Sequence, residues 1–100
     1  MKVKDFPLSE LESFAKTFIW WKRPSDAVAR PLRVIAQVME LGSFADVEKL
    51  AGIVGREAFR ETLLQAEAGW FSPPSWHFWH YKLGLAEIGS VPPTPERRIP

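Results

Sequence analysis

Apolar residues recur at helical spacing along most of the chain. Leu11, Phe14 and Phe18 follow one another at intervals of three or four residues, which is the repeat of one helical face. This pattern predicts a first helix over about 8–21. Pro24 ends it, because a proline pushes the residue before it out of the helical region.

Four further segments have the same periodicity, and glycine or proline bounds each of them. They predict helices from Pro31 to just before Gly42, over about 44–54, over about 56–68 and over about 76–83. Gly42 is expected to be a left-handed cap, Ser43 to cap the next helix through Asp46, and Phe44 to lie on the buried stripe of that helix. No segment alternates with a period of two, so we expect an all-α fold without a sheet.

The last ten residues have a different composition. They contain four prolines and two arginines: Pro92, Pro93, Pro95, Pro100, Arg97 and Arg98. Such a segment cannot form a helix and favours extended backbone. We therefore expect a compact helical domain of about five short helices over 1–90 and an extended tail over 91–100.

The composition is typical of a folded domain with a single hydrophobic core. Of the 100 residues, 46% are apolar, including five tryptophans and seven phenylalanines, and none is a cysteine. No apolar run approaches the roughly 18 residues that cross a bilayer, and the stretch 1–5 lacks the apolar segment of a signal peptide. A cytoplasmic location is the expectation. The net charge of +1 indicates no general attraction to nucleic acid.

The tryptophans are the most unusual feature. Trp20 and Trp21 are adjacent, so on a helix they point about 100° apart and cannot both face one core. The run 76–81 is bulky all round, so Phe78 or Tyr81 should face away from the core. Exposed aromatic rings often mark a binding surface. Equally, the proline-rich tail could fold back and cover them.

Two other features of the sequence, a pair of histidines and a possible helix-turn-helix, suggest different functions. His77 and His80 lie three residues apart on the last predicted helix, as two ligands of a metal-binding or enzymatic site could, but no carboxylate lies within a turn of them. A half-buried histidine among aromatic residues is the simpler interpretation of His80. The sequence predicts no cofactor.

The segment 50–64 has the outline of a helix-turn-helix. Its second helix, however, balances Arg56 and Arg60 with Glu57 and Glu61, whereas a helix that approaches phosphates normally carries net positive charge. An ordinary helical hairpin is the simpler interpretation, and a nucleic-acid-binding regulator is the alternative.

Four segments carry a family resemblance. They are residues 18–24 (FIWWKRP), 34–42 (VIAQVMELG), 71–85 (FSPPSWHFWHYKLGL) and 92–98 (PPTPERR). They resemble a family of short bacterial proteins encoded beside nucleotidyltransferase-fold toxins of the AbiEii/AbiGii type. The resemblance implies an antitoxin-like protein that docks on such a toxin and neutralises it. It supplies no active-site residues, and therefore implies a role without a mechanism.

Aromatic residues beside basic ones are the expected docking residues. The set predicted to bind the partner is Trp20, Trp21, Lys22, Arg23, Trp76, His77, Phe78, Tyr81, Arg97 and Arg98. The basic members would pair with acidic, metal-binding carboxylates around the active site of the partner. No catalytic, cofactor-binding or metal-binding residue is predicted, and a homodimer is left open.

Overall fold

The described part of the chain folds into six helices. In a computed structural model, which describes residues 8–87 and 89–96, none of the described residues lies in a β-strand. The helices are α1 (Leu8–Phe18), α2 (Pro24–Ala27), α3 (Pro31–Leu41), α4 (Phe44–Val54), α5 (Arg56–Leu64) and α6 (Pro73–Lys82). The all-α prediction is confirmed, and α2 is a single additional turn.

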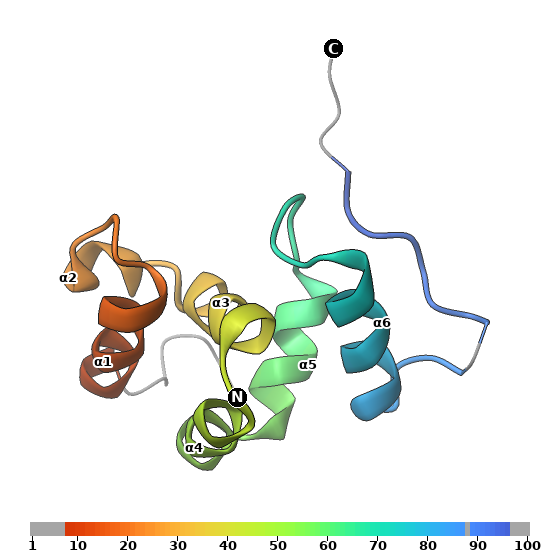
Figure 1. Cartoon of the computed structure of the whole chain (residues 1–100), viewed down its shortest axis with the longest axis horizontal. Helices are drawn as coiled ribbons and strands as arrows, with labels where there is room; N and C mark the ends of the chain where they lie inside the picture. Colours follow the sequence, from red (N-terminus) through yellow and green to blue (C-terminus); the bar gives the residue numbers. More distant parts are fainter. Residues whose placement is uncertain (1–7, 88, 97–100) are drawn as a thin grey trace.

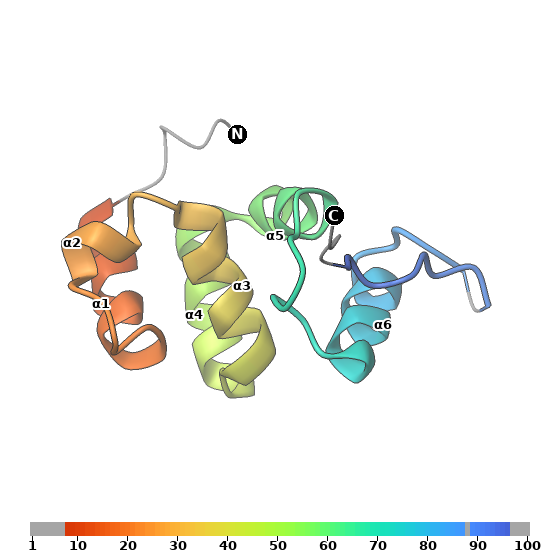
Figure 2. The same cartoon turned by 90° about the horizontal axis from the view of Figure 1, so that it is seen from above.

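Helix α3 lies in the middle of the molecule. It packs most extensively against α1 on one side and α5 on the other, and α4 also contacts it. Helices α1 and α2 occupy one end, and α6 occupies the opposite end, beyond α5 (Figures 1 and 2). Because neighbours surround it, α3 is buried nearly all round, and Val34, Ala36 and even Gln37 are inaccessible. Helical spacing predicts a buried stripe of Leu32, Ile35, Val38 and Met39, which is confirmed. Gln37, on the face expected to be exposed, is buried instead.

One hydrophobic core runs through all six helices. Its most enclosed side chains are Leu11, Val34, Ile35, Val38, Leu50, Val54 and Thr62. The last helix contributes a buried stripe of Trp76, Trp79, His80 and Leu83. Burial of each large apolar side chain contributes about 1.5–3 kcal/mol.

The helix ends differ from the predicted ones where the chain must turn. Helix α1 stops at Phe18, and a turn through Trp20 and Trp21 leads to Arg23, which is extended (φ −64°, ψ 139°) as a residue before proline should be. Helix α5 stops at Leu64, earlier than expected, because the chain turns there to bring Trp70 into the core.

The proline-containing start of α6 and one extended segment complete the fold. Helix α6 begins three residues earlier than expected, since Pro73 and Pro74 fit its first turn without needing N–H partners. Residues 89–96 contain no helix, in line with the predicted extended tail. No helix of the described part is long and apolar enough to cross a membrane.

Candidate functional site

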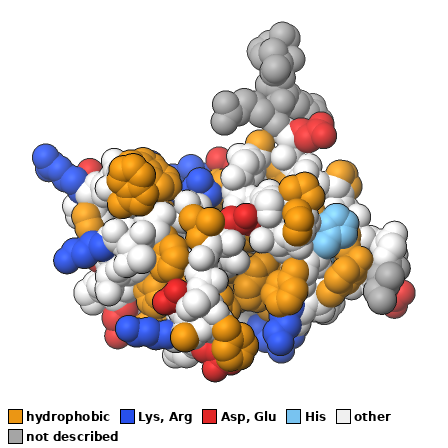
Figure 3. Space-filling model, viewed as in Figure 1, with side chains coloured by type: hydrophobic (Ala, Val, Ile, Leu, Met, Phe, Trp, Pro, Cys, Tyr) orange, Lys and Arg blue, Asp and Glu red, His pale blue; other side chains and the backbone are white. Residues whose placement is uncertain are grey.

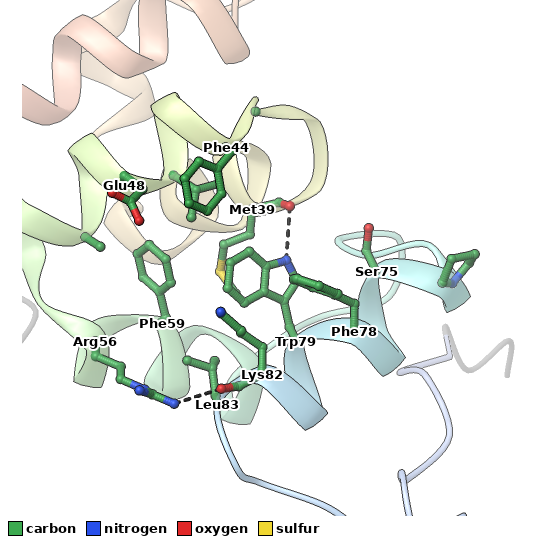
Figure 4. Close-up of a pocket in the computed structure, with 14 residues that line it drawn as sticks. Met39, Phe44, Glu48, Arg56, Phe59, Ser75, Phe78, Trp79, Lys82 and Leu83 are labelled. Carbon is green, nitrogen blue, oxygen red and sulfur yellow. Dashed lines mark hydrogen bonds between the residues drawn. The ribbon is translucent and has the colours of Figure 1, made fainter. Parts of the chain in front are cut away.

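An apolar groove lies between α4 and α6. Its volume is about 680 Å³ (Figure 4). The floor is made of buried side chains, namely Met39, Phe59, Trp79 and Leu83. Phe44 from α4 and Phe78 from α6 lie at the rim, with 77% and 55% of their surfaces exposed. Figure 3 shows hydrophobic side chains gathered over the same region.

Fixed contacts hold the floor of the groove in place. The Trp79 indole Nε1–H donates to the Met39 carbonyl oxygen at 3.1 Å, which ties α6 to the end of α3 (Figure 4). Phe59 of α5 packs edge-to-face on Trp79, with ring centroids 5.6 Å apart. Such aromatic pairs add about 0.5–1.5 kcal/mol beyond burial. The groove is therefore preformed.

A capping box sets the position of Phe44. The Asp46 backbone N–H donates to the Ser43 hydroxyl at 3.2 Å, and the Ser43 backbone N–H donates to the Asp46 carboxylate at 3.0 Å. This confirms the predicted cap and starts α4 at Phe44. The Ser43 hydroxyl also donates to the Asp46 carboxylate, at 2.9 Å. The bonds from the Ser43 backbone N–H and hydroxyl hold the pKa of the Asp46 carboxyl below its usual value, because they stabilise its charged form.

Sequence reasoning missed Phe44 as an exposed residue. It falls three residues before Val47 and so continues the buried stripe of its helix, which is why burial was expected. In the structure Phe44 begins α4, and none of the described elements covers it. Only the relative positions of α3, α4 and α6 reveal this, so no local signal could have found it.

The rim of the groove carries charges of both signs. Glu48, Arg56 and Lys82 line it. The Arg56 guanidinium donates to the Lys82 carbonyl oxygen at 2.7 Å, and Arg60 donates to the Leu83 carbonyl oxygen at 3.2 Å. Both arginines thus satisfy carbonyl groups at the end of α6, which are unpaired at any helix C-terminus.

The same two bonds bear on the helix-turn-helix alternative. The arginines that would have to reach phosphates are engaged with α6, and Arg60 also pairs with Glu57 at 2.7 Å. Helices α4 and α5 are joined by Gly55 alone, whereas recognition motifs use a turn of three or four residues. This geometry favours a structural hairpin.

The two histidines occupy different environments. His77 is exposed, whereas His80 is buried, with its ring 4.3 Å from that of Trp76. Each Nδ1 lies within hydrogen-bond distance of the carbonyl oxygen four residues earlier, Pro73 for His77 and Trp76 for His80. Across residues 8–87 and 89–96, no three His, Asp or Glu side chains come close enough to hold a metal ion.

The first group of predicted docking residues forms an exposed corner. Trp20 is 77% exposed and Trp21 51%, and their rings meet edge-to-face at 5.8 Å. Lys22 and Arg23 beside them are exposed too. This corner lies at the α1–α2 end of the molecule, opposite α6 (Figures 1 and 2). The structure does not bring it together with the aromatic residues of α6.

The second group divides between surface and core. His77, Phe78 and Tyr81 are exposed on α6. Trp76 is only 4% exposed, and its Nε1–H donates to the Pro92 carbonyl oxygen at 2.8 Å. A buried side chain whose donor is already satisfied cannot anchor a partner at the surface, so this residue is corrected to a structural role. Arg97 and Arg98 lie outside the described residues.

The comparisons with known proteins return no relative. No protein-family model, no curated protein and no solved structure matches the chain. The fold and the site define an all-α domain with a preformed apolar groove.

Proposed function

We propose that this protein is a protein-binding module whose groove between α4 and α6 receives an apolar helical segment of a partner. The observation that carries the proposal is the pair Phe44 and Phe78, both exposed on either side of a buried apolar floor. Exposed aromatic rings around a hydrophobic groove are typical of surfaces that bind an amphipathic helix.

The distribution of polar groups favours a peptide segment as the occupant. Glu48 and Lys82 lie on the lining beside the apolar floor and can pair with charges on the flanks of a bound helix. A small-molecule site usually adds a few convergent polar groups that orient the ligand. Met39, Phe59, Trp79 and Leu83, which form the floor, offer none.

The partner that we propose is a nucleotidyltransferase-fold toxin of the AbiEii/AbiGii type. The support for this identity is the resemblance of the four sequence segments, and the comparisons add none. Docking would neutralise the enzyme sterically, by covering the approach to its active site. Trp20, Trp21 and the neighbouring Lys22 and Arg23 would form a second contact, the basic pair facing carboxylates of the toxin.

The test uses a nucleotidyltransferase-fold toxin of the AbiEii/AbiGii type, expressed together with this chain. After co-purification, calorimetry would measure the affinity of variants Phe44→Ala and Phe78→Ala. Both side chains are largely exposed, so folding should be unchanged. We expect each variant to bind at least about tenfold more weakly, which corresponds to about 1.4 kcal/mol.

Leu64→Ala is the matched control. Leu64 is 70% exposed on α5 and does not line the groove, so its removal should leave affinity unchanged. If Trp20→Ala or Trp21→Ala weakens binding while Phe78→Ala does not, the groove is not the docking site. Absence of any complex between the two purified proteins would overturn the identity of the partner.

A further inference from the structure

A second, smaller cavity lies at the α1–α2 end of the molecule, opposite the groove. Its volume is about 160 Å³. The lining residues are Ile19, Trp21, Lys22, Asp26, Ala27, Arg30 and Arg33. Three cationic side chains thus surround this cavity, with one carboxylate.

The side chain of Arg33 lines this cavity and is half-buried. Its Nη1 is shielded from solvent and has no partner among the described residues. The guanidinium lies over the ring of Trp70, 5.6 Å from the centroid. Burial lowers the pKa of Arg33, and the positive charge of Arg30 lowers it further, against the opposing effect of Glu67. A buried N–H without an acceptor is destabilising, so an acceptor at this place would be stabilising.

The neighbouring charges leave the cavity positive. Arg30 pairs with Glu67 across the face of Trp70. Within the part of the chain that the structure describes, Lys22, Arg33 and Asp26 form no ion pair. Two uncompensated cations therefore face one carboxylate, and one positive charge is in excess.

We propose that this cavity binds a single oxyanion group, a phosphate or a carboxylate, held by Arg33 and Lys22. The guanidinium presents planar, forked N–H groups that match such an anion. Arg33 lines the cavity while its guanidinium lies over the ring of Trp70. A cavity of 160 Å³ is smaller than the roughly 300–1,000 Å³ of sites for whole ligands, so one functional group fits.

The experiment is a titration of the whole chain, followed by NMR through the indole N–H signals of Trp21 and Trp70. Inorganic phosphate and acetate are added separately, with sodium chloride at equal ionic strength as the reference. We expect a saturable shift with a dissociation constant in the millimolar range for at least one of the two anions. Their ranking identifies the anion as phosphate-like or carboxylate-like.

Variants distinguish a built site from general screening of charge. Arg33→Gln should weaken binding at least tenfold, and Lys22→Gln severalfold. Arg23→Gln removes a charge from the same corner but outside the cavity, and should bind like the wild type. Should Arg33→Gln fail to fold, the Lys22→Gln variant tests the proposal, because Lys22 is exposed and its replacement should not affect folding. Chemical shifts that do not saturate would overturn the proposal. So would an affinity for the anion that decreases equally in the Arg23→Gln and Lys22→Gln variants.

Discussion

The joint between α3 and α4 depends on the absence of a side chain at Gly42. The backbone there is extended (φ −72°, ψ 154°), which any residue can adopt, so the left-handed cap expected from the sequence was wrong. The requirement for glycine is one of space. A Cβ atom at this position would lie 2.6 Å from the Val38 carbonyl oxygen and 3.1 Å from its side chain.

Gly42→Ala should therefore destabilise the protein by about 1–3 kcal/mol, the usual cost of forcing an atom into a packed site. Gly52 provides the control, since it is exposed inside α4 and a Cβ there meets nothing within 4 Å. Gly52→Ala should stabilise the protein by about 0.5–1 kcal/mol, because alanine restricts the unfolded chain. Urea denaturation measures both changes. Equal effects of the same sign would contradict this account.

At the scale of elements, the start of α4 determines one side of the groove. The Ser43–Asp46 box satisfies backbone N–H groups that a helix start leaves unpaired. It also fixes the residue at which the helix begins, and with it the position of Phe44. Helix α6 begins differently: Ser72 occupies the same capping position but makes no side-chain cap bond.

Ser43→Ala should lower the free energy of unfolding by about 1 kcal/mol at neutral pH. Ser72→Ala, the matched control, should change it by less than about 0.5 kcal/mol. Chemical denaturation of both variants at pH 7 provides the comparison. A loss of equal size at Ser72 would show that the cap bond is not the cause.

The same pair of variants predicts a pH dependence. The folded-state pKa of Asp46 is below its ordinary value of 3.8, so its contribution is present above about pH 3.8 and is lost as pH falls through the folded value. The difference between the wild type and Ser43→Ala should therefore shrink at acid pH. It should not vanish, because the Ser43 hydroxyl still accepts from the Asp46 N–H. A difference that grows on acidification would have the wrong sign.

At the scale of the whole molecule, the tail is attached to the domain by Trp76. The indole of this residue reaches Pro92, sixteen positions later, and its ring packs on Phe71 and His80. The sequence left open whether the aromatic residues are exposed or covered by the tail. The tail does cover Trp76. It leaves Phe78 and Tyr81 exposed.

A chain that ends at Gly89 should lose this attachment without losing its core. We expect faster hydrogen exchange of the Trp76 indole N–H, because its acceptor is gone. The Trp79 indole, bonded to Met39 inside the domain, serves as an internal control and should exchange as before. NMR of the two indole signals measures both. Equal acceleration at Trp79 would mean that the tail supports the whole fold.

Local features of the sequence predicted most of the fold. The capping box of Ser43 and the end of α4 before Gly55 both follow from neighbouring residues. Part of the site was also within reach, since adjacency alone implied that Trp20 and Trp21 cannot share a core. The exposure of Phe44 and the unpaired nitrogen of Arg33 could not be predicted from the sequence, because both depend on which distant segments lie beside them.

The amino-acid order by itself determined which segments are helical and roughly where they end, because apolar periodicity, capping side chains and proline act over three or four residues. Only the tertiary structure decided that α3 is enclosed on several sides, that Trp76 belongs to the core, and that Phe44 and Phe78 line one groove. The physical reason is that a groove consists of the space between elements. Its shape follows from how α4, α5 and α6 pack around α3, and no single segment encodes that arrangement.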